Sequence, residues 1–134
     1  WKAYNATQPD LDVASLMQRG TPGMTDEEAA AYAAPFVDAT YKAGVRTFPN
    51  IVPVAPEMDG AAKGKAAAKF WATEWSGPTF MAVGVQDPVL GKPVMKMMQG
   101  LIRGCPEPMY VEDGGHFVQE RGEAIARAAL EAFG

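Results

Sequence analysis

The second half of this sequence predicts an α/β fold, because short apolar runs alternate with helical segments. The runs Thr79–Val85 and Met109–Val111 are followed by the helical patterns Lys92–Gln99 and Gly122–Phe133. The first run does not alternate with polar residues and follows Gly77-Pro78, which is typical of a strand buried on both faces of a parallel sheet. The order strand, helix, strand, helix predicts a mostly parallel sheet flanked by helices and built from right-handed crossovers.

The first 55 or so residues contain helix signals that do not fit this alternation and predict a separate helical layer. Asp10–Arg19 is expected to form a short helix, with its first residue as N-cap and the glycine that follows as its stop. Thr25 and Glu28 match a capping box, because the threonine hydroxyl can bond the third amide while the glutamate reaches back. The helix that they open is interrupted at Pro35.

The middle of the chain is interpreted as a loop followed by a helix. Thr47–Pro56 contains three prolines and is interpreted as a connecting loop. Ala61–Trp75 is rich in alanine and lysine and predicts a helix, with Phe70 and Trp71 as its buried residues. Of the two later helices, the first should end at Gly100. The second is expected to be amphipathic, with one side made of Ile125, Ala129, Leu130 and Phe133.

Length, charge and cysteine content limit the class of protein. The 134 residues begin at Trp1, and we expect them to be the C-terminal segment of a longer protein. A net charge of −4 makes nucleic acid and anionic membrane surfaces poor partners. The single cysteine, Cys105, excludes an internal disulfide and suits a reducing compartment. No apolar run approaches the roughly 20 residues that span a bilayer, and no signal peptide is visible, so we expect a cytoplasmic protein.

Catalytic chemistry is indicated by one acid and the one histidine, each placed shortly after a predicted strand. Asp87 follows the first strand and His116 follows the second. The carboxyl ends of parallel strands meet at one edge of the sheet, where functional groups gather in open α/β folds. A carboxylate bonded to one ring nitrogen fixes the tautomer of a histidine and leaves the other nitrogen free to take a proton. Gly114 and Gly115 allow the tight turn that would aim the ring.

Other interpretations of these residues stay open at this point. A lone histidine with a downstream Glu120 is often a surface or structural residue, and Gln86-Asp87-Pro88 is also an ordinary turn. One histidine without clustered carboxylates is a poor metal-ligand set, and no metal or other cofactor is expected. Neither of the two serines lies in a nucleophile elbow, and Cys105 lies in a loop without an activating helix start. The segment alone therefore lacks a nucleophile.

Several stretches of the chain resemble haloalkane dehalogenases, most closely those that act on small chlorinated alkanes. The matching stretches are Phe80–Gly91, Leu101–Pro108, Gly114–Glu120, Tyr32–Phe36 and Tyr41–Pro49, and the match is looser over Val54–Ala72. The resemblance implies an α/β-hydrolase fold with a helical cap domain, of which this chain is the C-terminal segment. Residues 1–55 would be the end of the cap domain, and residues 56–134 the C-terminal part of the hydrolase core.

The resemblance also implies roles for individual residues. An aspartate upstream of this chain would attack the carbon that bears the halogen and form an alkyl-enzyme ester. His116 would activate water to hydrolyse that ester, and Asp87 would orient His116. The register places a halide-binding tryptophan at Trp1, whose indole N–H is a donor without an acceptor. The same register lines the substrate pocket with the apolar side chains of Phe48, Pro49, Val52, Val89 and Leu90, which suit a small apolar halogenated substrate.

Two alternatives remain at the level of sequence. An epoxide hydrolase of the same fold shares the aspartate nucleophile and the water-activating pair, and it uses cap tyrosines as acids. Tyr32 and Tyr41 lie in the cap-like region and could supply them. A non-catalytic module that kept the fold is the other alternative. We expect the partners to be the halogenated substrate, water, halide and the remainder of the same hydrolase chain.

Overall fold

The computed structural model describes residues 2–134, which form two compact units. Unit 1 contains the chain up to Gln18 together with Met24–Ala66, and unit 2 contains Arg19–Gly23 together with Ala67–Gly134. Each unit is described by itself. The assignment of residues 1–55 to a cap domain and of residues 56–134 to a hydrolase core stays a prediction.

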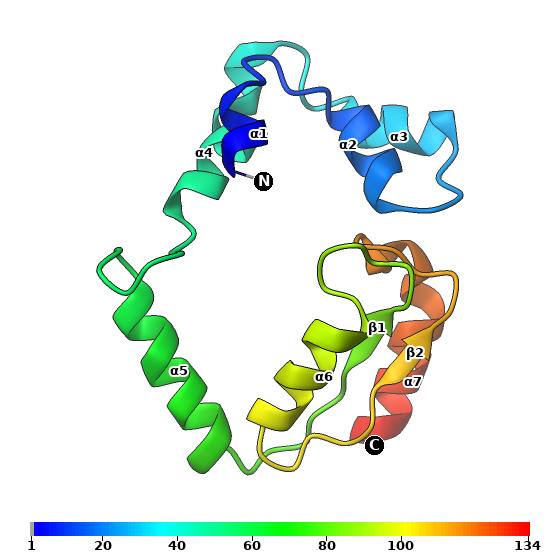
Figure 1. Cartoon of the computed structure of the whole chain (residues 1–134). Coiled ribbons are helices and arrows are strands. Elements are labelled where there is room, and N and C mark those ends of the chain that lie inside the picture. The colour runs from blue at the N-terminus through cyan, green and yellow to red at the C-terminus, as the bar shows by residue number, and fades with distance from the viewer. Residues whose placement is uncertain (1) are drawn as a thin grey trace. The chain divides into compact units, whose positions relative to one another are not determined.

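The elements follow the predicted change from helices alone to alternating helices and strands (Figure 1). The first half contains α1 (Lys2–Ala6), α2 (Val13–Gly20), α3 (Asp26–Ala33), the 3₁₀ helix η1 (Ala39–Lys42) and α4 (Ala43–Ile51). The second half contains α5 (Ala61–Thr73), β1 (Ala82–Gly84), α6 (Lys92–Leu101), β2 (Met109–Val111), the 3₁₀ helix η2 (Val118–Arg121) and α7 (Gly122–Phe133).

Two predicted helix starts in unit 1 had different outcomes. The capping box of α3 is confirmed, because the Thr25 side chain accepts from the Glu28 backbone and the Glu28 side chain accepts from the Thr25 backbone. The predicted N-cap Asp10 is wrong, since the Asp12 carboxylate accepts from the backbone N–H of Ser15 at 3.0 Å and α2 begins after it. Asp10 instead pairs with the buried Lys42, with 2.5 Å between Oδ1 and Nζ.

The core of unit 1 is small and apolar, and polar contacts join its first and fourth helices. Its buried hydrophobic residues are Leu11, Val13, Met17 and Ala29. Helix α1 lies beside α4 (Figure 1). The buried Asn5 donates from its side-chain amide to the Arg46 carbonyl at 2.6 Å, and the Lys2 ammonium donates to the Val52 carbonyl at 2.7 Å. These two bonds join α1 to the main chain of α4 and to that of the residue that follows it.

The interpretation of Thr47–Pro56 as a loop is wrong for its first half, because α4 continues to Ile51 with Pro49 inside it. Proline lacks the N–H that would bond the preceding turn and usually ends a helix. Here Pro49 cannot donate to the Val45 carbonyl one turn earlier, and the helix ends two residues after it. Pro49 is buried, which offsets part of that cost.

Unit 2 is built on a parallel pair of strands, as predicted. β1 and β2 pair in register with Val83 opposite Tyr110. The backbone bonds continue beyond both ends of β1, because Met109 donates to the Met81 carbonyl at 2.9 Å and Val85 donates to the Val111 carbonyl at 3.0 Å. Val83 is 2% exposed. In Figure 1, α6 and α7 lie on opposite sides of the strands. Helix α6 connects the two parallel strands and packs against β1.

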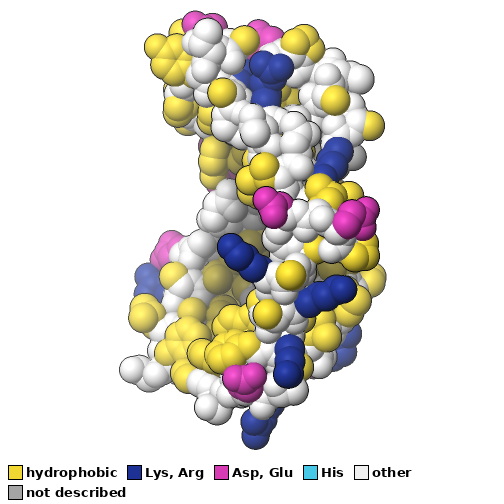
Figure 2. Space-filling model, turned by 90° about the vertical axis from the view of Figure 1, so that its left-hand side faces the viewer, with side chains coloured by type: hydrophobic (Ala, Val, Ile, Leu, Met, Phe, Trp, Pro, Cys, Tyr) yellow, Lys and Arg dark blue, Asp and Glu magenta, His cyan; other side chains and the backbone are white. Residues whose placement is uncertain are grey.

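Several apolar side chains that were expected to be buried are exposed. Phe70 and Trp71 on α5 are 41% and 38% exposed, so their prediction as buried residues is wrong. They contact each other and Trp75 through edge-on ring contacts instead of entering a core. Leu130 on α7 is 73% exposed, although Phe133 contacts Phe80. Figure 2 shows hydrophobic side chains at the surface over much of the face that it displays.

The centre of the strand pair provides a test of which apolar side chains stabilise unit 2. Val83→Ala should lower the free energy of unfolding by about 2–3 kcal/mol, because it removes buried methyl groups and leaves a cavity. Val37→Ala is the matched control, since Val37 is 79% exposed, and it should change the free energy by less than about 0.5 kcal/mol. Urea unfolding of both variants measures the difference. Equal effects would contradict a core centred on β1.

Candidate active site

The candidate site is formed by two loops that leave the carboxyl ends of the paired strands. β1 ends at Gly84 and a tight turn follows, in which the Asp87 amide lies 3.3 Å from the Gly84 carbonyl. β2 ends at Val111, and the Gly114 amide bonds the Val111 carbonyl at 3.0 Å. Because the strands are parallel and adjacent, both turns occur at the same edge of the sheet. This confirms the predicted juxtaposition of the two loops.

The two loops approach so closely that only glycine fits where they cross. A Cβ on Gly84 would overlap the carbonyl oxygen of Gly115 and lie 2.8 Å from that of Gly114. Gln86 then joins the loops through two hydrogen bonds. Its backbone amide donates to the Gly114 carbonyl at 2.9 Å, and its side-chain amide donates to the Glu112 carbonyl at 3.0 Å. The acid loop and the histidine loop are therefore fixed to each other by their main chains.

This crossing brings the two predicted catalytic side chains together. His116 Nδ1 lies 3.0 Å from both carboxylate oxygens of Asp87. The Asp87 side chain is 8% exposed, whereas that of His116 is 33% exposed. The acid is thus shielded from solvent, while the ring keeps an open side. Asp87 and His116 are thus the two predicted site residues of unit 2 whose side chains are hydrogen-bonded to each other.

The environment of Asp87 keeps it ionised. Burial of the carboxylate raises its pKa, but hydrogen bonds from the backbone N–H groups of Leu90 and Val89 and from His116 outweigh that effect. The two amides lie 3.0 Å and 2.7 Å from Oδ1. The pKa of Asp87 is therefore below its ordinary value, because these donors favour the charged form.

An ionised Asp87 determines what His116 can do. A carboxylate only accepts hydrogen bonds, so Nδ1 must carry the proton in this contact. In the neutral ring Nε2 is then without hydrogen and can take a proton from a reacting group. No hydrogen bond to Nε2 is formed within residues 2–134. The nearby negative charge stabilises the imidazolium that results, so the arrangement is that of a general base with its orienting acid.

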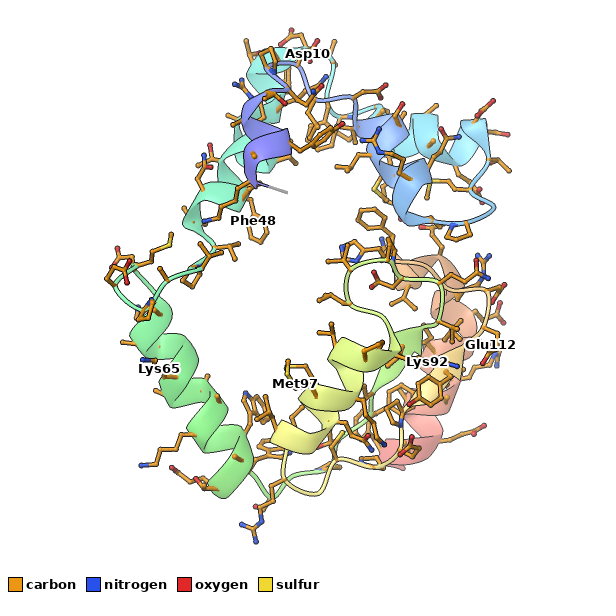
Figure 3. All side chains as sticks on the ribbon, viewed as in Figure 1. Asp10, Phe48, Lys65, Lys92, Met97 and Glu112 are labelled. Atoms are coloured by element: carbon orange, nitrogen blue, oxygen red, sulfur yellow. The ribbon has the colours of Figure 1, made fainter. Side chains whose placement is uncertain are left out.

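The predicted pocket residues occur in both units. Phe48 and Pro49 lie on α4 and Val52 directly follows that helix, all in unit 1; Figure 3 labels the exposed Phe48. Val89 and Leu90 lie in unit 2, where they are 60% and 45% exposed while their amides bond Asp87. Within unit 2, the backbone amides of Val89 and Leu90 thus lie next to the pair formed by Asp87 and His116. Trp1 lies outside the described residues.

Other candidates from the sequence have structural roles or low reactivity. The Trp75 indole N–H donates to Thr79 Oγ1 at 2.9 Å, and its ring contacts that of Trp71 edge-on. Burial raises the pKa of the Cys105 thiol, which lowers the fraction of reactive thiolate. Within the part of the chain that the structure describes, no group of three or more His, Cys, Asp or Glu residues could bind a metal ion.

Two features of the site were not predicted from the sequence. Gln86 was considered only as part of a turn, and Gly20 only as a helix stop, although its carbonyl accepts from the His116 amide at 2.7 Å. The hydrogen bond from the Gln86 side chain to the Glu112 carbonyl links residues 26 positions apart. The bond from the His116 amide to the Gly20 carbonyl links residues 96 positions apart. No local sequence pattern specifies such distant backbone contacts.

Comparisons with known proteins agree in both sequence and structure. No protein-family model matches the chain. It is 31% identical over 132 residues to a haloalkane dehalogenase of Mycolicibacterium paratuberculosis, and 32% identical over 132 residues to haloalkane dehalogenase 1 of Mycobacterium tuberculosis. Each alignment covers 97% of this chain and 44% of the relative. The chain thus spans less than half of the length of these relatives.

A solved structure extends this similarity to the fold. The haloalkane dehalogenase DpaA of Paraglaciecola agarilytica, described as a tetramer, matches 99% of this chain with a TM-score of 0.92 and 43% identity. The match covers 45% of that chain. The resemblance drawn from the sequence is confirmed, and so is the predicted fold class, the α/β-hydrolase fold.

The environment of Asp87 predicts a pH-dependent contribution to stability. Because folding lowers its pKa, the contribution is present above the unfolded-state value of about 3.9 and is lost as the pH falls through the lowered value. Asp87→Asn should therefore reduce the free energy of unfolding by about 1–3 kcal/mol at pH 7. The difference from wild type should shrink as the pH falls below the unfolded-state value and Asp87 becomes protonated. Chemical unfolding at several pH values measures it.

Asp59→Asn is the control for this experiment. Asp59 is exposed and forms no hydrogen bond or ion pair within residues 2–134. Its substitution should leave the pH dependence of unfolding unchanged. If both variants follow the same pH profile, the hydrogen bonds around Asp87 do not stabilise its charge.

Proposed function

We propose that this chain, which is similar throughout to the C-terminal part of haloalkane dehalogenases, supplies the water-activating half of such an active site. The enzyme would cleave the carbon–halogen bond of small haloalkanes and yield an alcohol and a halide ion. The observation that carries the proposal is the contact between His116 Nδ1 and both oxygens of the shielded, ionised Asp87. We propose His116 and Asp87 as the catalytic residues of this chain.

The proposed reaction has two steps, of which this chain performs the second. In the first, an aspartate outside this sequence attacks the carbon and the halide leaves, giving an ester. In the second, His116 Nε2 removes a proton from water while the water oxygen bonds the ester carbonyl carbon. Collapse of the tetrahedral intermediate breaks the ester bond, and the proton from His116 goes to the departing alcohol oxygen. The aspartate is regenerated, and atoms and charge balance.

The geometry suits the second step for an electrostatic reason. The step makes a cation at His116, and the negative charge that stabilises it is already present on Asp87 before the proton arrives. The shielding of Asp87 strengthens this interaction, because the effective dielectric constant is lower away from water. The exposed side of His116 leaves space for the attacking water.

The residues proposed to contact the substrate and the halide are assigned from the resemblance of the sequence to haloalkane dehalogenases. Phe48, Pro49, Val52, Val89 and Leu90 would line the pocket, and their apolar side chains match a small uncharged haloalkane. Trp1 would donate its indole N–H to the leaving halide, since a desolvated anion needs a donor. We expect the partners to be substrate, water, halide and the remainder of the same hydrolase chain.

A cytoplasmic location is part of the same proposal. Among the described residues, no helix is both long enough and apolar enough to cross a membrane. The single cysteine suits a reducing compartment.

His116→Gln in the complete protein should separate the two steps. Glutamine keeps polarity and approximate size but cannot act as the base, so the ester should form and persist. We expect one equivalent of halide per active site, followed by a steady-state rate reduced by about 10³-fold or more. Rapid-mixing halide assays with 1,2-dichloroethane, and mass spectrometry of the protein for the added alkyl group, measure both effects.

A substitution on α5 serves as the control for His116→Gln. Lys65→Gln on the exposed face of α5, labelled in Figure 3, should leave both phases unchanged. Multiple turnovers by His116→Gln at the wild-type rate would exclude His116 as the base. Turnover of epoxides but not haloalkanes by the wild-type protein would favour an epoxide hydrolase instead.

Trp1→Phe tests the proposed halide role, because phenylalanine keeps the apolar surface and removes the N–H. Halide binding should weaken by about 10- to 100-fold, the loss expected for one hydrogen bond to a charged group. Quenching of the fluorescence by bromide in a titration measures it. Trp75→Phe is the matched control, since the Trp75 N–H already donates to Thr79. An equal effect of both variants would contradict the assignment of Trp1.

A further inference from the structure

A five-residue segment from the helical half of the sequence belongs to the unit that contains His116. Arg19–Gly23 forms part of unit 2, whereas the residues on both sides of it belong to unit 1. The segment contains the end of α2 and the turn that follows, and Thr21 in it is only 4% exposed. Thr21 is thus buried, and Gly20 before it is partly buried, whereas Arg19, Pro22 and Gly23 are exposed.

The main chain of this segment contacts the main chain of the histidine loop. The Gly20 carbonyl accepts from the His116 backbone N–H at 2.7 Å. A Cβ on Gly115 would overlap that same carbonyl oxygen and lie 2.5 Å from Cδ of Pro22. Gly115 thus packs against the turn with no space for a side chain. The position of His116 along its loop depends on this contact as well as on the contact with the acid loop.

The imidazole ring of His116 is also contacted by the Phe117 ring, whose position depends on Gly20. A Cβ on Gly20 would lie 2.7 Å and 2.9 Å from Cε2 and Cδ2 of Phe117. The Phe117 ring therefore occupies the space where a side chain of residue 20 would be. The same ring contacts the His116 ring edge-on, with 5.2 Å between centroids and an interplanar angle of 72°.

We propose that Gly20 and Phe117 are positioning residues for His116. The Gly20 carbonyl fixes the His116 main chain, and the absence of a side chain at Gly20 leaves space for the Phe117 ring, which contacts the imidazole edge-on. The inference rests on the proposed function, since it assigns these residues to the step that His116 performs. It places control of that step in a turn about 95 residues upstream in the sequence.

The proposal predicts a selective defect in Gly20→Ala of the complete protein. The added methyl group would displace the Phe117 ring and with it the imidazole, whereas formation of the ester does not use His116. We expect the halide burst to keep its amplitude and the steady-state rate to fall by about 10- to 100-fold, the cost of a misplacement of about 1 Å. Gly64→Ala is the matched control, because a Cβ at that exposed helical position meets nothing within 4 Å.

Rescue separates positioning from general destabilisation. Phe117→Ala added to Gly20→Ala removes the two ring atoms that the methyl group would meet, so the double variant should recover part of the lost steady-state rate. Phe117→Ala alone should show the same selective defect in a weaker form, because the ring support is absent. A steady-state rate of Gly20→Ala within twofold of wild type would overturn the proposal. So would a joint loss of burst and turnover that Phe117→Ala does not relieve.

A spectroscopic measurement distinguishes failure of this inference from failure of the proposed function. The imidazole ¹⁵N signals report which ring nitrogen carries the proton and require no turnover. In Gly20→Ala they should move from a single Nδ1-protonated tautomer toward a mixture, because the bond to Asp87 is displaced. An unchanged ¹⁵N spectrum overturns the positioning role even if the protein is a dehalogenase. A changed spectrum in a protein without any dehalogenase activity supports the positioning role and overturns the proposed function.

Discussion

The candidate site depends on the close approach of two main chains at the carboxyl ends of β1 and β2. Gly84 lies against the carbonyl groups of Gly114 and Gly115 with no space for a Cβ, and Gly115 in turn lies against the Gly20 carbonyl. Each of these glycines is required by a neighbour and not by an unusual backbone angle. The acid loop, the histidine loop and the turn at Gly20 can therefore pack with their main chains in direct contact. At that separation the hydrogen bonds that fix the loops are made between backbone groups, which have little freedom to move.

This packing explains why a short contact between Asp87 and His116 can persist without a rigid environment on every side. Each loop is fixed near its functional residue by backbone bonds, and the carboxylate also accepts from two amides of its own turn. The side chains then have few conformations available to lose when they pair, so the entropic cost of the contact is small. The His116 side chain can remain one-third exposed and still be oriented.

Much of the fold and the central pair of the site could be predicted from the sequence, because both depend on local patterns. The bounds of β2 and α7, the capping box at Thr25 and the parallel pairing follow from apolar runs, caps and breakers. The failures have physical causes. Asp10 and Asp12 are both suitable N-cap residues. Asp12 caps the helix while Asp10 pairs with Lys42, and that ion pair is a tertiary contact that the local sequence does not specify. The exposure of Phe70, Trp71 and Leu130 likewise depends on what surrounds each helix, which its amphipathic pattern does not specify.

The acid loop combines a fixed backbone with free side chains. The amides of Val89 and Leu90 bond the Asp87 carboxylate, while their side chains are largely exposed. An amide is common to every residue type except proline, so these bonds impose almost no requirement on which amino acids occupy the two positions. In the proposed enzyme, substitution there could reshape the wall that meets the substrate while the acid stays in place. Substrate range and catalytic geometry would then be free to evolve separately at adjacent positions of one loop.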